Sequence, residues 1–142
     1  MSEAKPTGIY AFKWLDRNGV TTGGNRPYKW ELPIGCNPSK WHSNRTKKPI
    51  KVCVNGFHCI GAEEIVNFKP YGPRLFLVEI AGRFDSSTQK LAVEHIRLIE
   101  ELTYMYKNGG LIVKSQAGLP STYLKESITN SGRIGLNAIG KV

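Results

Sequence analysis

The chain has 142 residues, of which 40% are hydrophobic and 22% are charged, and its formal net charge is +9. This length is typical of one domain that is large enough to bury a core. No apolar run approaches the roughly 20 residues of a membrane-spanning helix, and the first residues (MSEAKP) lack the apolar stretch of a signal peptide. Three cysteines are too few, and odd in number, for a disulfide scaffold. We therefore expect a soluble, cytoplasmic protein without a membrane partner.

The basic excess is concentrated in the N-terminal part of the chain. Residues 1–60 hold ten Lys or Arg against three acids, whereas residues 61–102 hold five against seven. Cations that bind phosphates, beside rings that stack on bases, are typical of a nucleic-acid surface. A solvated basic face over core tryptophans is the competing interpretation, and composition alone barely separates the two. The candidate nucleic-acid-binding residues are Lys13, Trp14, Arg17, Arg26, Tyr28, Lys29, Trp30, Trp41, Arg45, Lys47 and Lys48.

The first elements in chain order are strands and a loop. Residues 8–15 (GIYAFKWL) are rich in aromatic residues and predict a strand, which the turn signal of residues 16–19 (DRNG) ends. Residues 28–32 (YKWEL) alternate apolar and charged side chains and predict a half-buried strand. Residues 34–49 show almost no apolar periodicity, so we expect a long exposed loop there.

The central stretch, residues 51–82, is the part around which the fold is expected to form. Residues 51–54 predict a strand, residues 55–56 (NG) a turn, and residues 62–68 a short helix that Pro70 ends. Residues 75–82 form an almost uninterrupted apolar run, which is typical of a strand buried on both faces. Its single acid, Glu79, is expected to pair with an arginine such as Arg74 or Arg97.

The last part of the chain is less regular. Residues 83–89 (RFDSSTQ) predict a turn, and residues 91–102 fit a helix slightly better than a strand by periodicity. Residues 104–107 and 111–114 flank Asn-Gly-Gly and predict a hairpin. We expect one α+β domain over residues 1–114, a bent, mostly antiparallel sheet system with one or two short helices. Residues 115–142 are rich in Gly, Ser and Asn and predict a tail that is loosely held or docks on a partner.

Two resemblances add to this interpretation. Cys53, the run Gly56-Phe57-His58-Cys59, Val78-Glu79, Gly82 and residues 96–102 resemble an uncharacterised small domain family of tailed phages and bacteria, over roughly residues 8–102. That resemblance implies a phage origin but no chemistry.

A weaker similarity is to the rifampicin-modifying ADP-ribosyltransferases, through residues 74–79 (RLFLVE), residues 82–85 (GRFD) and a closing strand like residues 96–102. It implies a strand within residues 91–102 and a pocket that binds NAD, with His58 and Asp85 in or near it. Those enzymes carry a histidine in the first strand, where this chain has Tyr10-Ala11-Phe12. The candidate catalytic residues are thus Tyr10, His58 and Asp85, although a hydrogen-bonded structural role is the commoner one for a lone histidine.

The leading hypothesis is a small, basic, phage-type protein that binds or modifies DNA or RNA in the host cytoplasm and needs no cofactor. The alternatives are an ADP-ribosyltransferase-like enzyme that uses NAD, and a non-catalytic inhibitor that binds a host protein. Cys36, His42, Cys53, His58 and Cys59 lack a Cys-x-x-Cys spacing, so we expect no structural zinc. The sequence predicts no oligomeric state.

Overall fold

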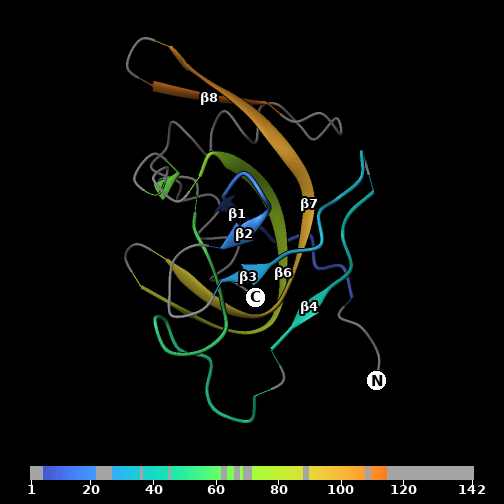
Figure 1. Ribbon diagram of the computed structural model, residues 1–142. Coiled ribbons are helices and arrows are strands. Elements are labelled where there is room, and N and C mark those ends of the chain that lie inside the picture. The colour runs from blue at the N-terminus through green and yellow to red at the C-terminus, as the bar shows by residue number, and fades with distance from the viewer. Residues whose placement is uncertain are drawn as a thin grey trace.

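The computed structural model describes residues 5–21, 27–35, 37–44, 46–61, 64–65, 68, 72–87, 90–107 and 110–114. Within these ranges the protein is mostly antiparallel β-sheet and contains no α-helix (Figure 1). No helix in the described part is long and apolar enough to cross a membrane. The strands are β1 (Tyr10–Leu15), β2 (Val20–Thr21), β3 (Tyr28–Lys29), β4 (His42–Ser43), β5 (Phe57–Cys59), β6 (Arg74–Ser86), β7 (Leu91–Lys107) and β8 (Gly110–Lys114).

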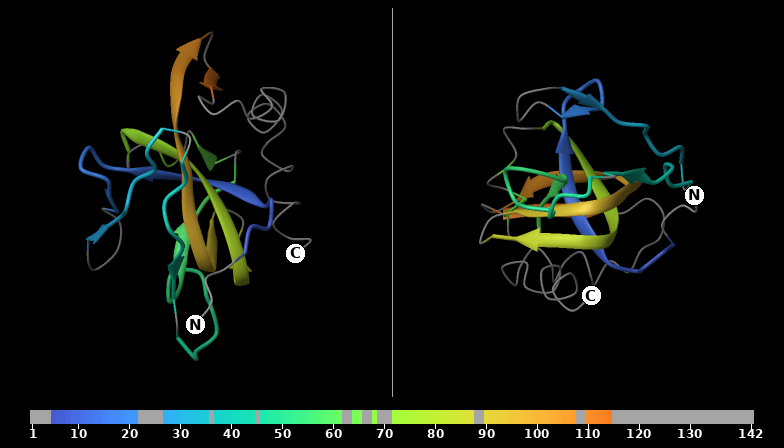
Figure 2. Two further views of the ribbon diagram at one scale, coloured as in Figure 1. Left: turned by 90° about the vertical axis from the view of Figure 1, so that its right-hand side faces the viewer. Right: turned by 90° about the horizontal axis from the view of Figure 1, so that it is seen from below.

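The long hairpin of β6 and β7 forms the centre of the sheet. β1 pairs with the other side of β6, while β4, β5 and β8 all pair with β7. The β6–β7 register shifts at Leu77/Val78 and again between Ala81 and Phe84, where Gly82 has a φ of +80°. Such bulges increase local bend and twist. Figures 1 and 2 show β6 and β7 curving together, so that the sheet is strongly bent.

The bend brings β1 back to the end of β5. Phe12 and Ile60 form an isolated antiparallel bridge, with hydrogen bonds of 2.8 Å from Phe12 N to Ile60 O and 2.9 Å from Ile60 N to Phe12 O. In the described part of the chain these are the only main-chain hydrogen bonds between the two segments. We call this junction the β1–β5 seam. In the described part, the sheet is therefore closed by this one bridge, and β1 and β5 are not paired on either side of it.

Two apolar clusters pack against opposite faces of the sheet. β6 supplies both, because Phe76, Val78 and Ile80 belong to the interior cluster and Leu75 and Leu77 to the outer one. The predicted strand with two buried faces is confirmed. The interior cluster consists of Ala11, Leu15, Trp30, Cys59, Phe76, Val78, Ile80, Leu91, Val93, Ile96 and Leu98. The outer cluster consists of Phe12, Trp14, Ile60, Ile65, Leu75, Leu77, Leu102 and Val113.

The helix favoured by periodicity for residues 91–102 is wrong, because this segment is the first part of β7. Most residues of this segment pair with residues of β6 in an antiparallel register. This pairing and the packing between neighbouring strands outweigh a weak helical pattern in the sequence. For the described residues the expected class, α+β, is corrected to mostly β, and the mostly antiparallel, bent sheet is confirmed. The helix expected at residues 62–68 lies mainly outside the described residues. Of its described members, Phe68 N donates to Glu64 O at 3.1 Å.

Other predicted elements differ in their bounds. Residues 51–54 form a turn rather than a strand, since Lys51 O accepts hydrogen bonds from Val54 N and Asn55 N. β6 continues through Ser86, where a turn was expected, and only Tyr28–Lys29 of the strand predicted at 28–32 is paired.

The loop predicted at residues 34–49 is exposed only in part. Ser39, Trp41 and His42 are buried, and Ser39 N donates to Leu98 O of β7. The strand at residues 8–15 and the β7–β8 hairpin are confirmed. The tail from residue 115 lies outside the described residues.

Candidate functional site

Lys13 points into the interior of the bent sheet. It lies between Ala11 and Leu15 on the inward face of β1 and is 7% exposed. Its Nζ donates a hydrogen bond to the His58 main-chain oxygen and lies 5.2 Å from the centre of the Trp30 ring. Among the described residues Lys13 forms no ion pair. Burial is the main cause that lowers the pKa of its ammonium to about 8, and Cys59 has a smaller, opposing effect.

A cavity of about 480 Å³ opens beside Lys13 at the β1–β5 seam. Tyr28, Trp30 and Phe57 form an aromatic wall, and Lys90 adds a second cation. No carboxylate belongs to its described lining. A concave site with apolar walls and a few polar groups is the usual form of a small-ligand pocket.

A second, more polar hollow of about 510 Å³ adjoins the first and shares Tyr28 and Trp30 with it. Lys29, Lys40 and Trp41 also line this hollow. The two hollows thus meet at one pair of aromatic rings and have lysines on both sides.

The shared rings belong to a packed aromatic cluster. The ring centres of Tyr28 and Trp30 are 4.8 Å apart, and those of Trp30 and Phe57 are 5.4 Å apart. Tyr28 Oη lies 2.8 Å from His42 Nδ1, and Trp30 Nε1 donates to Thr21 Oγ1 at 2.6 Å. These bonds fix the ring planes, while Tyr28 remains 40% exposed. Tyr28 is therefore the rigid and accessible ring of this cluster, whereas the Trp30 side chain is buried.

His42 is neutral within this cluster. Burial is the main cause that lowers its pKa, and Lys40 lowers it further against the opposing effect of Glu31. Its Nε2 is buried and has no hydrogen-bond partner in the described part of the chain. A neutral ring is consistent with that environment, because a charged imidazole would need a second acceptor.

His58 and Asp85 both hold the turn of residues 51–55. His58 Nε2 accepts a hydrogen bond of 2.8 Å from Cys53 N, and Asp85 Oδ2 accepts one of 2.9 Å from Val52 N. Both residues lie opposite Ala92 of β7, so they share one row of the sheet. Burial, followed by Lys13 and Lys90, lowers the pKa of His58 to about 4. A neutral His58 is therefore an acceptor for the turn.

The three predicted catalytic residues do not line one cavity. His58 lines the seam cavity, whereas Tyr10 packs against the outer cluster and lies opposite Glu79. Asp85 binds the turn and is not among the residues of that cavity's wall. No three His, Cys, Asp or Glu side chains of the described residues gather as they would around a metal ion.

The predicted nucleic-acid residues separate into groups. Lys13 and Trp14 line the seam cavity together with Tyr28 and Trp30, but Trp14 Nε1 also donates to Ile65 O at 2.7 Å. Lys29 and Trp41 reach the second hollow.

The remaining predicted residues lie elsewhere or outside the described part. Arg17 is exposed, and its carbonyl oxygen accepts a hydrogen bond of 3.3 Å from Arg74. Arg26 and Arg45 lie outside the described residues, and Lys47 and Lys48 are exposed on a different segment. The list of candidate residues omitted Phe57, Lys40 and Lys90. Phe57 had a signal because it belongs to the resemblance run, and Lys40 had one because it is a cation of the basic N-terminal part beside Trp41.

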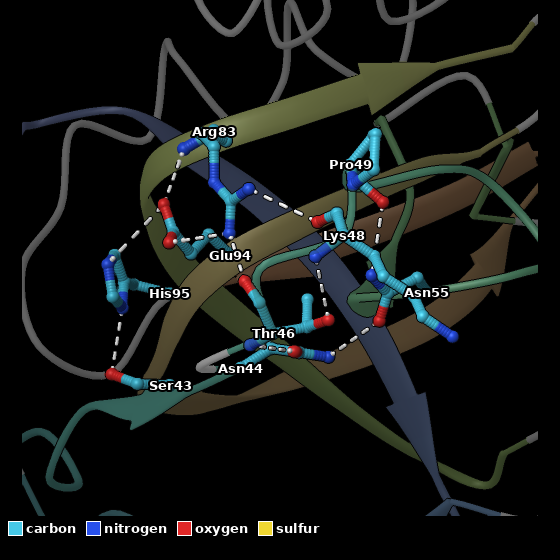
Figure 3. A network of polar contacts seen from close by, with 9 residues as sticks. All are labelled: Ser43, Asn44, Thr46, Lys48, Pro49, Asn55, Arg83, Glu94 and His95. Atoms are coloured by element: carbon cyan, nitrogen blue, oxygen red, sulfur yellow. Dashed lines mark hydrogen bonds and ion pairs between the residues drawn. The ribbon is translucent and has the colours of Figure 1, made fainter.

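The segment of Lys47 and Lys48 is held to the bulge of β6 by Arg83 (Figure 3). Arg83 donates to Thr46 O at 2.8 Å and to Lys48 O at 3.2 Å, and it pairs with Glu94 Oε2 at 3.0 Å. The hydrogen bond from Arg83 is also the main cause that lowers the pKa of Glu94. Arg83, Glu94, Thr46 and Lys48 have a structural role here, and none of them belongs to the lining of either hollow.

These features define a class, a small antiparallel β-domain whose bent sheet leaves an aromatic cavity with cations at its seam. Residues 9–106 match the family described as domain of unknown function DUF7666, and the chain belongs to that family. The expected membership of an uncharacterised domain family is confirmed, whereas an origin in tailed phages and bacteria stays a prediction. No curated protein and no solved structure matches the chain. Likeness to ADP-ribosyltransferases is not shown.

Proposed function

We propose that this domain binds single-stranded DNA or RNA across the two hollows that meet at Tyr28 and Trp30. The observation that carries the proposal is the seam cavity itself, in which Lys13 and Lys90 stand beside an aromatic wall without any carboxylate in the described lining. Such a cavity favours a ligand that is both aromatic and anionic. Nucleotides combine these two properties.

The second hollow supports a polynucleotide rather than a free nucleotide. Lys29 and Lys40 line it, and both are exposed. Lysines along a groove bind successive phosphates, while aromatic side chains stack on the bases of an unpaired strand. The net charge of +9 favours association with a polyanion at long range. A phage origin and action in the host cytoplasm belong to the same proposal.

The alternatives have less support. Tyr10, His58 and Asp85 do not share a cavity, so no observation favours an enzyme that uses NAD. An inhibitor of a host protein would need a docking face, and no feature of the described surface is specific to one.

Replacement of Tyr28 tests the proposal. Tyr28→Ala removes a stacking surface that is worth about 1 to 3 kcal/mol per base, so affinity for a single-stranded oligonucleotide should fall at least severalfold. Tyr28→Phe keeps the ring and loses only the contact with His42, so it is the matched control and should bind nearly as well as the wild type. Fluorescence titration at low salt measures all three proteins. If the wild type binds neither single-stranded DNA nor RNA at low salt, the proposed function is wrong.

A further inference from the structure

We propose that the seam cavity captures an abasic nucleotide of a single DNA strand, through an imine between Lys13 Nζ and the aldehyde carbon of the base-free sugar. The inference rests on the proposed function and adds a covalent step to its deepest site. Three observations carry it. Lys13 is buried, it belongs to the wall of the cavity, and it has no ion-pair partner among the described residues.

Lys13 has the surroundings of an amine that can react. It is more than nine-tenths buried, and in the described part its nitrogen has one hydrogen-bond partner, the His58 carbonyl oxygen. Because its pKa is lowered to about 8, roughly one Lys13 in ten is a neutral amine at pH 7, against roughly one exposed lysine in 2,500. Only the neutral amine is a nucleophile, and desolvation in an apolar pocket is a usual way to activate a lysine.

The hydrogen bond to His58 holds this nitrogen at the seam in either protonation state. A neutral amine keeps two N–H groups and one lone pair, so it can donate to the carbonyl oxygen and still attack a carbon atom. Since β1 and β5 are bridged only at Phe12 and Ile60 in the described part, no continuing ladder separates Lys13 from the cavity. Lys13 and His58 both belong to the cavity's lining.

The cavity suits a sugar that has lost its base. Its volume is about 480 Å³, but the Trp30 ring beside Lys13 is only 4% exposed and leaves little surface for a stacked base. The place for a stacked base is Tyr28, which is 40% exposed and lines both hollows. An abasic sugar next to that base lacks a whole ring system and is therefore small enough to go deeper. Lys90, the second cation of the cavity, can bind its phosphate.

The step needs no reagent besides the two partners. The neutral Nζ attacks the C1′ carbonyl carbon of the open-chain sugar and forms a C–N bond. The carbonyl oxygen takes both amine hydrogens and leaves as water, so that a C=N double bond remains. An intact nucleotide has its base on C1′ and no free aldehyde. The chemistry itself therefore selects abasic positions.

Reductive trapping tests the inference. A short single-stranded oligonucleotide with one abasic site is incubated with the protein and sodium cyanoborohydride, which reduces the imine to a stable amine. A denaturing gel measures the rate of adduct formation, and mass spectrometry of the digested adduct locates it. We expect the adduct at Lys13 and a rate at least about tenfold above that of Lys13→Met, in which only ordinary lysines remain. Lys47→Met is the matched control and should react like the wild type, because Lys47 is exposed and lines neither hollow.

A second oligonucleotide separates this inference from the proposed function. It carries a tetrahydrofuran ring at the abasic position, which has no aldehyde, so it reports binding alone. Circular dichroism shows whether each variant is folded; if Lys13→Met does not fold, the location of the wild-type adduct decides alone. Binding of the tetrahydrofuran strand with adducts spread over other lysines, or with an undiminished rate in folded Lys13→Met, overturns the inference while the proposed function stands. Neither binding nor adduct formation overturns both.

Discussion

Lys13 places an ammonium where the pattern of β1 calls for an apolar side chain. Its neighbours on the same face, Ala11 and Leu15, belong to the interior cluster, and no ion pair in the described part compensates its charge. A buried charge without an ion-pair partner is costly, and such costs are often retained where a group serves binding. Lys13 therefore offers a direct test of whether function or stability determines this position.

We expect Lys13→Met to stabilise the protein at neutral pH. The pKa of Lys13 is lowered from 10.5 to about 8, so the charged form costs on the order of 3 kcal/mol in the folded state. Loss of the hydrogen bond to the His58 carbonyl oxygen subtracts about 1 kcal/mol, which leaves a net gain of about 2 kcal/mol. Urea unfolding of wild type and variant measures this difference.

The pH dependence gives a second check on Lys13. Between about pH 8 and 10.5 the unfolded chain binds more protons at this site than the folded one, so the stability of the wild type should rise with pH in that window. The variant should lack this part of the rise. A wild type and a variant with the same slope there would show that Lys13 is not desolvated.

Glu79 is the opposite case, a buried charge with full compensation. Its carboxylate pairs with Arg97 at 2.7 Å and accepts hydrogen bonds from the main-chain nitrogens of Thr7 and Gly8. The sequence predicted an arginine partner, because one acid in an apolar strand needs one, and the structure confirms Arg97. The segment before β1 is tied to β6 through the same side chain.

Glu79→Ala should destabilise the fold by about 3 to 5 kcal/mol, because it leaves Arg97 unpaired and the two nitrogens without an acceptor. Glu101→Ala is the matched control. It breaks the Arg74–Glu101 pair, whose side chains are 28% and 40% exposed, and should cost less than about 1 kcal/mol. Thermal unfolding compares the two variants. Equal losses would contradict the assignment of Glu79 as a buried anchor.

At the scale of elements, the turn of residues 51–55 depends on the neutral state of His58. Since the pKa of His58 falls from 6.5 to about 4 on folding, the unfolded chain binds more protons between these values. Stability should therefore decrease as the pH falls from about 6.5 to 4, when protonated Nε2 can no longer accept from Cys53 N. His58→Gln has no titrating group, so the same acid titration should show a shallower loss for this variant. An unchanged acid slope would remove His58 from this role.

The bulge of β6 gives a second prediction for an element. Gly82 has a φ of +80°, and a Cβ there would lie 2.6 Å from Glu94 Oε1 and 2.7 Å from His95 Cδ2. Gly82→Ala should cost about 2 to 3 kcal/mol, from backbone strain and from displacement of Glu94 away from Arg83. Gly35→Ala separates the two causes, because φ is +57° and no atom lies within 4 Å. It should cost only about 1 kcal/mol in the same unfolding measurement. A Gly82→Ala cost no larger than that of Gly35→Ala would mean that the bulge tolerates a side chain.

Local pattern was sufficient for some elements and not for others. β1, the buried centre of β6 and the β7–β8 hairpin follow from apolar runs and turn residues, which act over short distances along the chain. The first part of β7 does not, because Leu91, Leu98 and Leu102 also fit one helical face, and only pairing with β6 selects the strand. Likewise, Trp41 and His42 are buried by contacts with β7 that no nearby residue indicates.

For the whole molecule, the sequence predicted the ingredients of the site but not their arrangement. Tyr28, Lys29 and Trp30 were identified from rings beside cations, and they do line the hollows. The cavity itself arises from the return of β1 to Ile60, a contact between segments far apart in the chain. In the folded protein Lys13 is buried beside the cavity, whereas Lys47 is exposed and lines neither hollow. The number of charged residues in the sequence does not distinguish these two lysines.

The salt dependence of binding should therefore differ between clusters of lysines that carry equal charge. Each phosphate contact with a single strand contributes roughly 0.7 to the slope of log K against log salt concentration. We expect Lys29→Gln with Lys40→Gln to lower that slope by about 1.4, because both side chains line the second hollow.

Lys47→Gln with Lys48→Gln is the matched control, since it removes the same charge from the segment that Arg83 holds. The control should leave the slope nearly unchanged and affect affinity only through net charge. Fluorescence titrations of one oligonucleotide at several salt concentrations provide both slopes. Equal changes in the two double variants would mean that the strand is attracted by the overall charge of +9 and not by the groove beside Tyr28 and Trp30.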